Sequence, residues 1–118
     1  MQVTLHCDEF GRVVGTIAHN GAQTTVTSSD AGSALAGLRE AVESAAAGGP
    51  GECFWHEAAG DYRWVFRREG GTLRLAVLWS AGTLTGWEHR AWVECDAREL
   101  RDAICAAIDA CPVLEAQR

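Results

Sequence analysis

The first pair of side chains with the spacing of a metal site is a cysteine and a histidine. Cys53-x-x-His56 resembles half of a zinc site, because thiolate and imidazole groups are preferred zinc ligands. The surrounding residues alternate as in a β-strand, and a separation of three places the two side chains on opposite faces of a sheet. No second Cys-x-x-Cys or His-x-His pair follows. We therefore expect no metal and no other cofactor, and we interpret the five cysteines as reduced core residues.

Carboxylates next to histidines could supply an acid and a base at His56-Glu57 and at Glu88-His89. Neighbours along a strand point to opposite faces, so neither pair forms a dyad by itself. The alternation predicts Glu57, Tyr62 and His89 on the inner face of one sheet. An inward carboxylate near a histidine and a tyrosine is typical of a pocket. One interpretation of the chain is therefore a small enzyme or ligand-binding domain with its pocket at these three residues.

Motifs that specify a reaction are absent from the sequence. There is no Gly-x-Ser-x-Gly elbow, no phosphate-binding loop and no dinucleotide fingerprint. The chain contains no lysine, which excludes Schiff-base chemistry. We therefore assign no catalytic residue and favour a binding domain over an enzyme.

Basic and aromatic side chains gather on the opposite side of the same sheet, which we call the outer face. The alternation places on it four arginines and one tryptophan, Arg63, Arg67, Arg74, Arg90 and Trp92. Trp and Arg are enriched among residues that dominate binding energies, and Trp92 opposite Arg74 would make a cation–π contact of about 0.5–1 kcal/mol. We expect this face to bind a protein partner or a second copy of the chain. The alternative is a solvated face on which arginine stems cover Trp92.

Residues 52–79 must position these side chains, and they read as three antiparallel strands. The expected turns are Ala59-Gly60 and Gly70-Gly71, because glycine suits two-residue hairpin turns. Symmetric pairing about the first turn predicts Trp55 opposite Trp64 and Cys53 opposite Phe66. About the second turn it predicts three pairs, Phe66 with Leu75, Trp64 with Val77, and Tyr62 with Trp79. Trp64 then lies at the centre of the core.

The rest of the chain supplies four more strands and two helices. We expect strands at residues 2–7, 12–18, 23–28 and 87–95, the last with Leu75 opposite Ala91. Ser29 or Asp30 caps a helix that stops at residues 48–49, and Asp96 opens a helix that Pro112 ends. The order βββ-α-ββββ-α predicts one α+β domain over residues 1–118, an antiparallel sheet with both helices on one face.

Composition narrows the classes of function. The chain has 118 residues, 47% of them hydrophobic, and a net charge of −6, so the basic footprint of a nucleic-acid-binding protein is missing. No apolar run is long enough to span a membrane, and the first residues lack the pattern of a signal peptide, so we expect a cytoplasmic protein. Arginine in place of lysine, with abundant Ala and Gly, suggests a GC-rich bacterial genome. By size and charge alone, bacterial immunity proteins and secretion chaperones are comparable, and the sequence predicts a small acidic binding domain.

Overall fold

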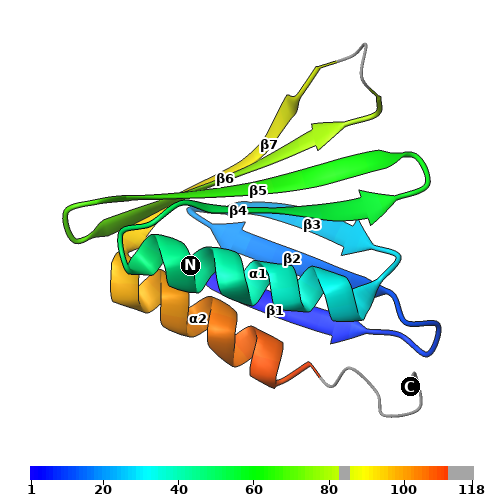
Figure 1. Ribbon diagram of the computed structural model, residues 1–118, viewed down its shortest axis with the longest axis horizontal. Coiled ribbons are helices and arrows are strands. Elements are labelled where there is room, and N and C mark those ends of the chain that lie inside the picture. The colour runs from blue at the N-terminus through cyan, green and yellow to red at the C-terminus, as the bar shows by residue number, and fades with distance from the viewer. Residues whose placement is uncertain (83–85, 112–118) are drawn as a thin grey trace.

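The computed structural model describes residues 1–82 and 86–111. Two antiparallel sheets and two helices follow one another along the chain (Figure 1). Their bounds are β1 (Gln2–Cys7), β2 (Val13–His19), β3 (Ala22–Ser28), α1 (Ala31–Ala46), β4 (Gly51–Glu57), β5 (Gly60–Glu69), β6 (Thr72–Ser80), β7 (Glu88–Asp96) and α2 (Ala97–Asp109). The α+β class and the element order predicted from the sequence are confirmed.

The single sheet that the sequence suggested is wrong, because the strands form two sheets. One sheet has the order β1-β2-β3 and the other the order β4-β5-β6-β7. Strands β3 and β4 approach each other only at one end, where the backbone amide of Ser29 donates to the carbonyl of His56 over 3.1 Å. The whole of α1 separates β3 from β4 in the chain, so no tight turn enforces pairing along their length.

Both helices begin where the sequence placed their caps. The carboxylate of Asp30 accepts a hydrogen bond from the backbone amide of Ser33, and the carboxylate of Asp96 accepts from Arg98 and Glu99. Helix α1 packs on β4 and β5, and α2 packs on β1 and contacts β6 and β7. Figure 1 shows the two helices side by side. Pro112, expected to end the second helix, lies outside the described residues.

The core is built on the inner face of the second sheet, the side against which α1 packs. Trp55 and Trp64 are completely buried there, with ring centroids 4.9 Å apart, which confirms the central position predicted for Trp64. The first sheet packs over the same core near Trp55. A Cβ on Gly15 of β2 would lie only 2.9 Å from Cδ2 of Leu5 and 3.4 Å from Trp55, so a larger residue there would displace the Leu5 side chain.

The register of the first hairpin in the second sheet is offset from the prediction by two residues. Cys53 lies opposite Trp64, and Trp55 lies opposite Tyr62, because the turn is Ala58-Ala59. Gly60 belongs to β5, where a Cβ would collide with the carbonyl oxygen of Ser80. This glycine serves close backbone contact rather than the turn. An offset of two leaves every side chain on its predicted face.

The second hairpin pairs as predicted. Tyr62 lies opposite Trp79, Trp64 opposite Val77, and Phe66 opposite Leu75. The turn between the two strands is Gly70-Gly71, as the sequence indicated.

The pairing predicted for the last strand is wrong, again by two residues. Leu75 faces Val93 instead of Ala91, and Trp92 faces Ala76 instead of Arg74. A bulge interrupts the pairing between Val77 and Leu78, and a long connection cannot hold the register as a two-residue turn does.

Candidate interaction surface

The outer face of the second sheet is the side that faces away from the core. Its residues alternate with buried ones along β4 to β7, and none of those described on it is buried. By register they form rows across the strands. One row is Phe54, Arg63, Leu78 and His89, the next is Glu52, Val65, Ala76 and Trp92, and the third is Arg67, Arg74 and Glu94.

An arginine packs against two neighbouring aromatic rings at one end of this face. The guanidinium carbon of Arg63 is 5.9 Å from the ring centroid of Phe54 and 5.6 Å from that of Trp87, within cation–π range. The two rings are 6.1 Å apart. Glu52 holds the guanidinium from the side, accepting from Nε of Arg63 over 2.8 Å. These contacts keep the cluster in one arrangement although Phe54 is 41% and Trp87 43% exposed.

Trp92 forms the second aromatic group of the outer face. Its side chain is 50% exposed, and its ring centroid lies 6.2 Å from that of His89. The half-buried Val65 and Ala76 continue the row of Trp92 across β5 and β6. Three of the four large apolar side chains that are exposed among the described residues, Phe54, Trp87 and Trp92, therefore lie on or beside this sheet face. The fourth, Phe10, lies in the connection between β1 and β2.

Of the four arginines predicted for this face, Arg63, Arg67 and Arg74 lie in its rows, and Arg90 lies at the bulge of the edge strand β7. Each of the four is near a carboxylate. Arg74 forms ion pairs with Glu69 at 2.8 Å and with Glu94 at 3.3 Å. Arg90 lies 3.6 Å from Glu88 at the edge strand. Arg67 is the most exposed, with 79% of its side chain accessible and a single carboxylate, that of Glu69, at 3.8 Å. The predicted contact between Arg74 and Trp92 is replaced by the contacts of Arg63 with Phe54 and Trp87.

The three residues of the alternative pocket are not brought together. Glu57 lies on β4 and His89 on β7, the two edges of the sheet. The bulge in β7 pairs His89 with Leu78 on the outer face, so the inward orientation predicted for His89 is wrong. Tyr62 lies between them and packs against Trp79 with ring centroids 4.5 Å apart.

Glu57 instead joins the two sheets. Its Oε2 atom accepts from the guanidinium of Arg12 and from the hydroxyl of Thr27, each over 2.8 Å. Only 14% of its side chain is accessible, and Oε1 is buried without a hydrogen-bond partner in the described structure. The partners come from outside the second sheet, so the alternation that placed Glu57 inward could not predict them. This arrangement explains the inward carboxylate as part of the core.

Cys53 and His56 point to opposite faces, as the odd spacing predicted. Burial raises the pKa of the Cys53 thiol to about 12, with a smaller contribution from Glu52, so this thiol is a poor metal ligand at neutral pH. On the other side of the strand, Nδ1 of His56 lies 2.6 Å from a carboxylate oxygen of Asp61. Within the described parts of the chain, no three His, Cys, Asp or Glu side chains are grouped as metal ligands would be.

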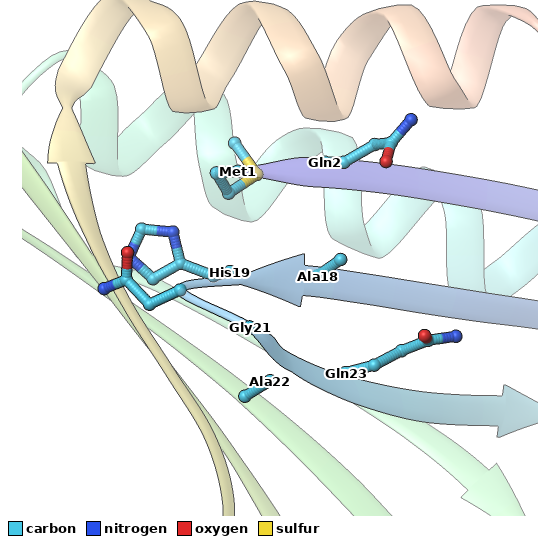
Figure 2. Close-up of a pocket in the computed structure, with 8 residues that line it drawn as sticks. Met1, Gln2, Ala18, His19, Gly21, Ala22 and Gln23 are labelled. Atoms are coloured by element: carbon cyan, nitrogen blue, oxygen red, sulfur yellow. The ribbon is translucent and has the colours of Figure 1, made fainter.

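A separate hollow lies away from this face, at the end of the first sheet. It has a volume of about 680 Å³ and opens between the start of β1 and the turn after β2 (Figure 2). It is lined by Met1, Gln2, Ala18, His19, Asn20, Gly21, Ala22 and Gln23. His19 is its only side chain suited to acid–base chemistry, and Nδ1 of that ring is buried without a described partner. With one such group and a wide opening, the hollow does not assemble a reaction site.

The aromatic cluster around Arg63 was not predicted from the sequence. The sequence placed Arg63 on the outer face, but it took Trp87 as the start of the last strand. The structure begins that strand at Glu88 and folds Trp87 over the face. The sequence feature that could have indicated this contact is an aromatic residue, Trp87, directly before the last strand.

Comparison of the sequence with models of protein families and with curated proteins finds no match. The described helices also include none that is long and apolar enough to cross a membrane.

Proposed function

We propose that this chain is a small protein-binding domain that contacts its partner through the outer face of the β4–β7 sheet. The observation that carries the proposal is the gathering of Phe54, Trp87 and Trp92 on a sheet face without a buried residue. Three exposed aromatic rings on one sheet face are unusual for an inert surface, on which exposed apolar side chains are usually scattered singly.

The composition of this face fits a protein partner. Trp and Arg are the side chains most enriched among residues that dominate interface energies. On this face Arg63 already contacts Glu52 and two aromatic rings. Its side chain therefore has little conformational entropy left to lose when a partner binds. The half-buried Val65 and Ala76 are smaller than Trp92 and lie in the same row, so a partner's side chain can pack on them beside the indole ring.

The setting of this function is also a proposal. We infer a bacterial, cytoplasmic binding domain, because arginine replaces lysine throughout and the five cysteines are free thiols. The net charge of −6 supports solubility rather than nucleic-acid binding. A toxin-neutralising or chaperone-like role would be consistent with this size and acidity.

Photochemical cross-linking tests the proposal with a matched control. A photoreactive phenylalanine analogue replaces Phe54, which is on the outer face, or Phe10, which is 79% exposed but away from it. The two positions carry the same native residue, so the substitution is equally conservative. In cells that express the protein, we expect a defined adduct from position 54 and none from position 10, with its composition read by mass spectrometry.

Either a copy of this chain or a different protein in the position-54 adduct would support a binding role for the face. No adduct from position 54, or the same adducts from both positions, would contradict it.

A further inference from the structure

We infer that a small hollow where α1 ends and α2 begins binds a phosphate group, either as the free ion or on a small organic molecule. The hollow has a volume of about 180 Å³ and is lined by Ala46, Arg68, Ala97, Arg98 and Arg101. Figure 1 shows the end of α1 and the start of α2 at the same end of the molecule. Arg68 reaches α1 on the helix side of the sheet, away from the outer face. The inference therefore goes beyond the proposed function and does not depend on it.

The lining of this hollow has three positive charges and no carboxylate, although the whole chain carries −6. In the described parts of the chain, Arg68 and Arg98 are the two arginines that form no ion pair with a carboxylate, and both line the hollow. Arg101 pairs only with Asp102, its neighbour in the chain, at 2.9 Å. Like charges gathered in one hollow repel each other, and an anion bound between them replaces that repulsion with attraction.

The carboxylates of Asp96 and Glu99 belong to the same part of the chain but do not line the hollow. The carboxylate of Asp96 accepts hydrogen bonds from the backbone amides of Arg98 and Glu99, each over 3.1 Å. The amide of Ala97 donates to the carbonyl of Gly71 over 2.8 Å. The first amides of α2 are thus already satisfied, so the arginine side chains must hold the ligand.

Arg68 is fixed at the wall of the hollow by two uncharged acceptors. Its Nε donates to the carbonyl of Gly70 over 2.7 Å, and its Nη1 donates to the carbonyl of Ala46 at the end of α1. A guanidinium has five N–H donors, so three remain for a ligand. Capping of α1 explains Arg68 but not Arg98, whose side chain has no hydrogen bond or ion pair within the described residues.

A phosphate group fits three guanidinium groups better than a carboxylate does. A carboxylate has one charge and two oxygens, and a single arginine satisfies it, as Arg63 does for Glu52. A phosphate group carries about −1.5 to −2 at pH 7 and three strong acceptor oxygens. Arginine binds such oxygens through paired N–H donors. The hollow is smaller than the ~300–1,000 Å³ of pockets that enclose drug-sized ligands, so it suits the phosphate group alone, with any organic part outside.

Isothermal titration calorimetry on the purified full-length chain tests the inference, with inorganic phosphate as the probe at low salt. At about pH 8 phosphate carries close to two negative charges. We expect one saturable site per chain with a dissociation constant of roughly 1 mM or below, because each guanidinium adds charge-assisted hydrogen bonds. Added sodium chloride should weaken the binding, since salt screens exposed charges. The absence of saturable binding up to about 20 mM phosphate would overturn the inference.

The variant Arg98→Gln should bind phosphate about tenfold more weakly or worse, because it loses one guanidinium of the hollow. No hydrogen bond of the fold is lost, and circular dichroism checks that the variant folds. The control Arg67→Gln removes the same charge from an arginine of the outer face that is 79% exposed, and its affinity should stay within about twofold of the wild type. If Arg98→Gln binds like the wild type, or if both variants lose the same affinity, the hollow is not the site and the inference is wrong.

Phenyl phosphate distinguishes the two sources of the phosphate group. Binding at least as tight as that of inorganic phosphate, and weakened by Arg98→Gln, would support a phosphate carried by an organic molecule. Tighter binding of inorganic phosphate, with the same effect of Arg98→Gln, would support the free ion. The cross-link from position 54 tests the outer face separately, so a failure of this site leaves the proposed function unchanged.

Discussion

The two buried tryptophans of the core provide a matched test of hydrogen bonding. Trp55 and Trp64 are both completely buried, and their rings pack against each other. They differ at the indole nitrogen. Nε1 of Trp55 donates to the carbonyl of Ala34 in α1 over 3.1 Å, whereas Nε1 of Trp64 is buried with no hydrogen-bond partner among the described residues. Replacing each by phenylalanine removes the same atoms from two neighbouring sites.

The expected free energies of unfolding follow from these contacts. Each Trp→Phe change loses apolar contacts and leaves a small cavity, at about 1–2 kcal/mol. Trp55→Phe loses a hydrogen bond worth a further ~0.5–1.5 kcal/mol. Trp64→Phe instead removes an unsatisfied buried donor, whose desolvation costs about 1–3 kcal/mol in the wild type. We expect Trp55→Phe to be less stable than Trp64→Phe by about 2 kcal/mol or more, and Trp64→Phe to be close to the wild type.

Urea unfolding followed by far-ultraviolet circular dichroism measures this difference, since the variants themselves change the Trp fluorescence. Equal slopes of free energy against urea would show that the denatured states are comparable. If Trp64→Phe is as destabilised as Trp55→Phe, or more so, the Trp64 indole has a partner, such as an enclosed water molecule. The reasoning from its unsatisfied nitrogen would then be refuted.

Two further predictions concern ionisable groups. Arg12→Met should lower the free energy of unfolding by about 1–3 kcal/mol, because it leaves the mostly buried Glu57 with only the hydroxyl of Thr27 as a partner. Arg12 itself is 43% exposed, which keeps the loss below that of a fully buried ion pair. Adding Glu57→Gln should recover part of this loss in urea unfolding, and no recovery would contradict the role of the pair. Burial raises the pKa of Cys53 from its ordinary value of 9.0 to about 12, so the folded state retains a proton that the unfolded state releases. This contribution to stability is complete below about pH 9 and is lost as the pH rises towards 12. Unfolding measured at about pH 8 and pH 10.5 should therefore show a larger loss for the wild type than for Cys53→Ala; equal losses would refute it.

Local chemistry determined which residues share a face. Alternation along the strands separated Cys53 from His56 and placed Trp64 in the core, and both predictions hold because side chains in a strand repeat every two residues. The Gly70-Gly71 turn set the register of β5 and β6, since a two-residue turn leaves no slack. Asp30 and Asp96 marked both helix starts, because their carboxylates satisfy the first backbone amides.

Tertiary contacts decided what alternation leaves open. A shift of two residues keeps every side chain on its face, so the pattern could not show that Gly60 serves close contact with Ser80 rather than the turn. A bulge reverses the face of every residue beyond it, so the bulge in β7 turns His89 outward. His89 therefore does not share the inner face with Glu57 and Tyr62, as the predicted pocket required. Trp87 joined Arg63 and Phe54 only when the chain folded back over the sheet. Periodicity assigns the faces because it is local, whereas the residues that meet on them depend on strand pairing and packing between distant segments.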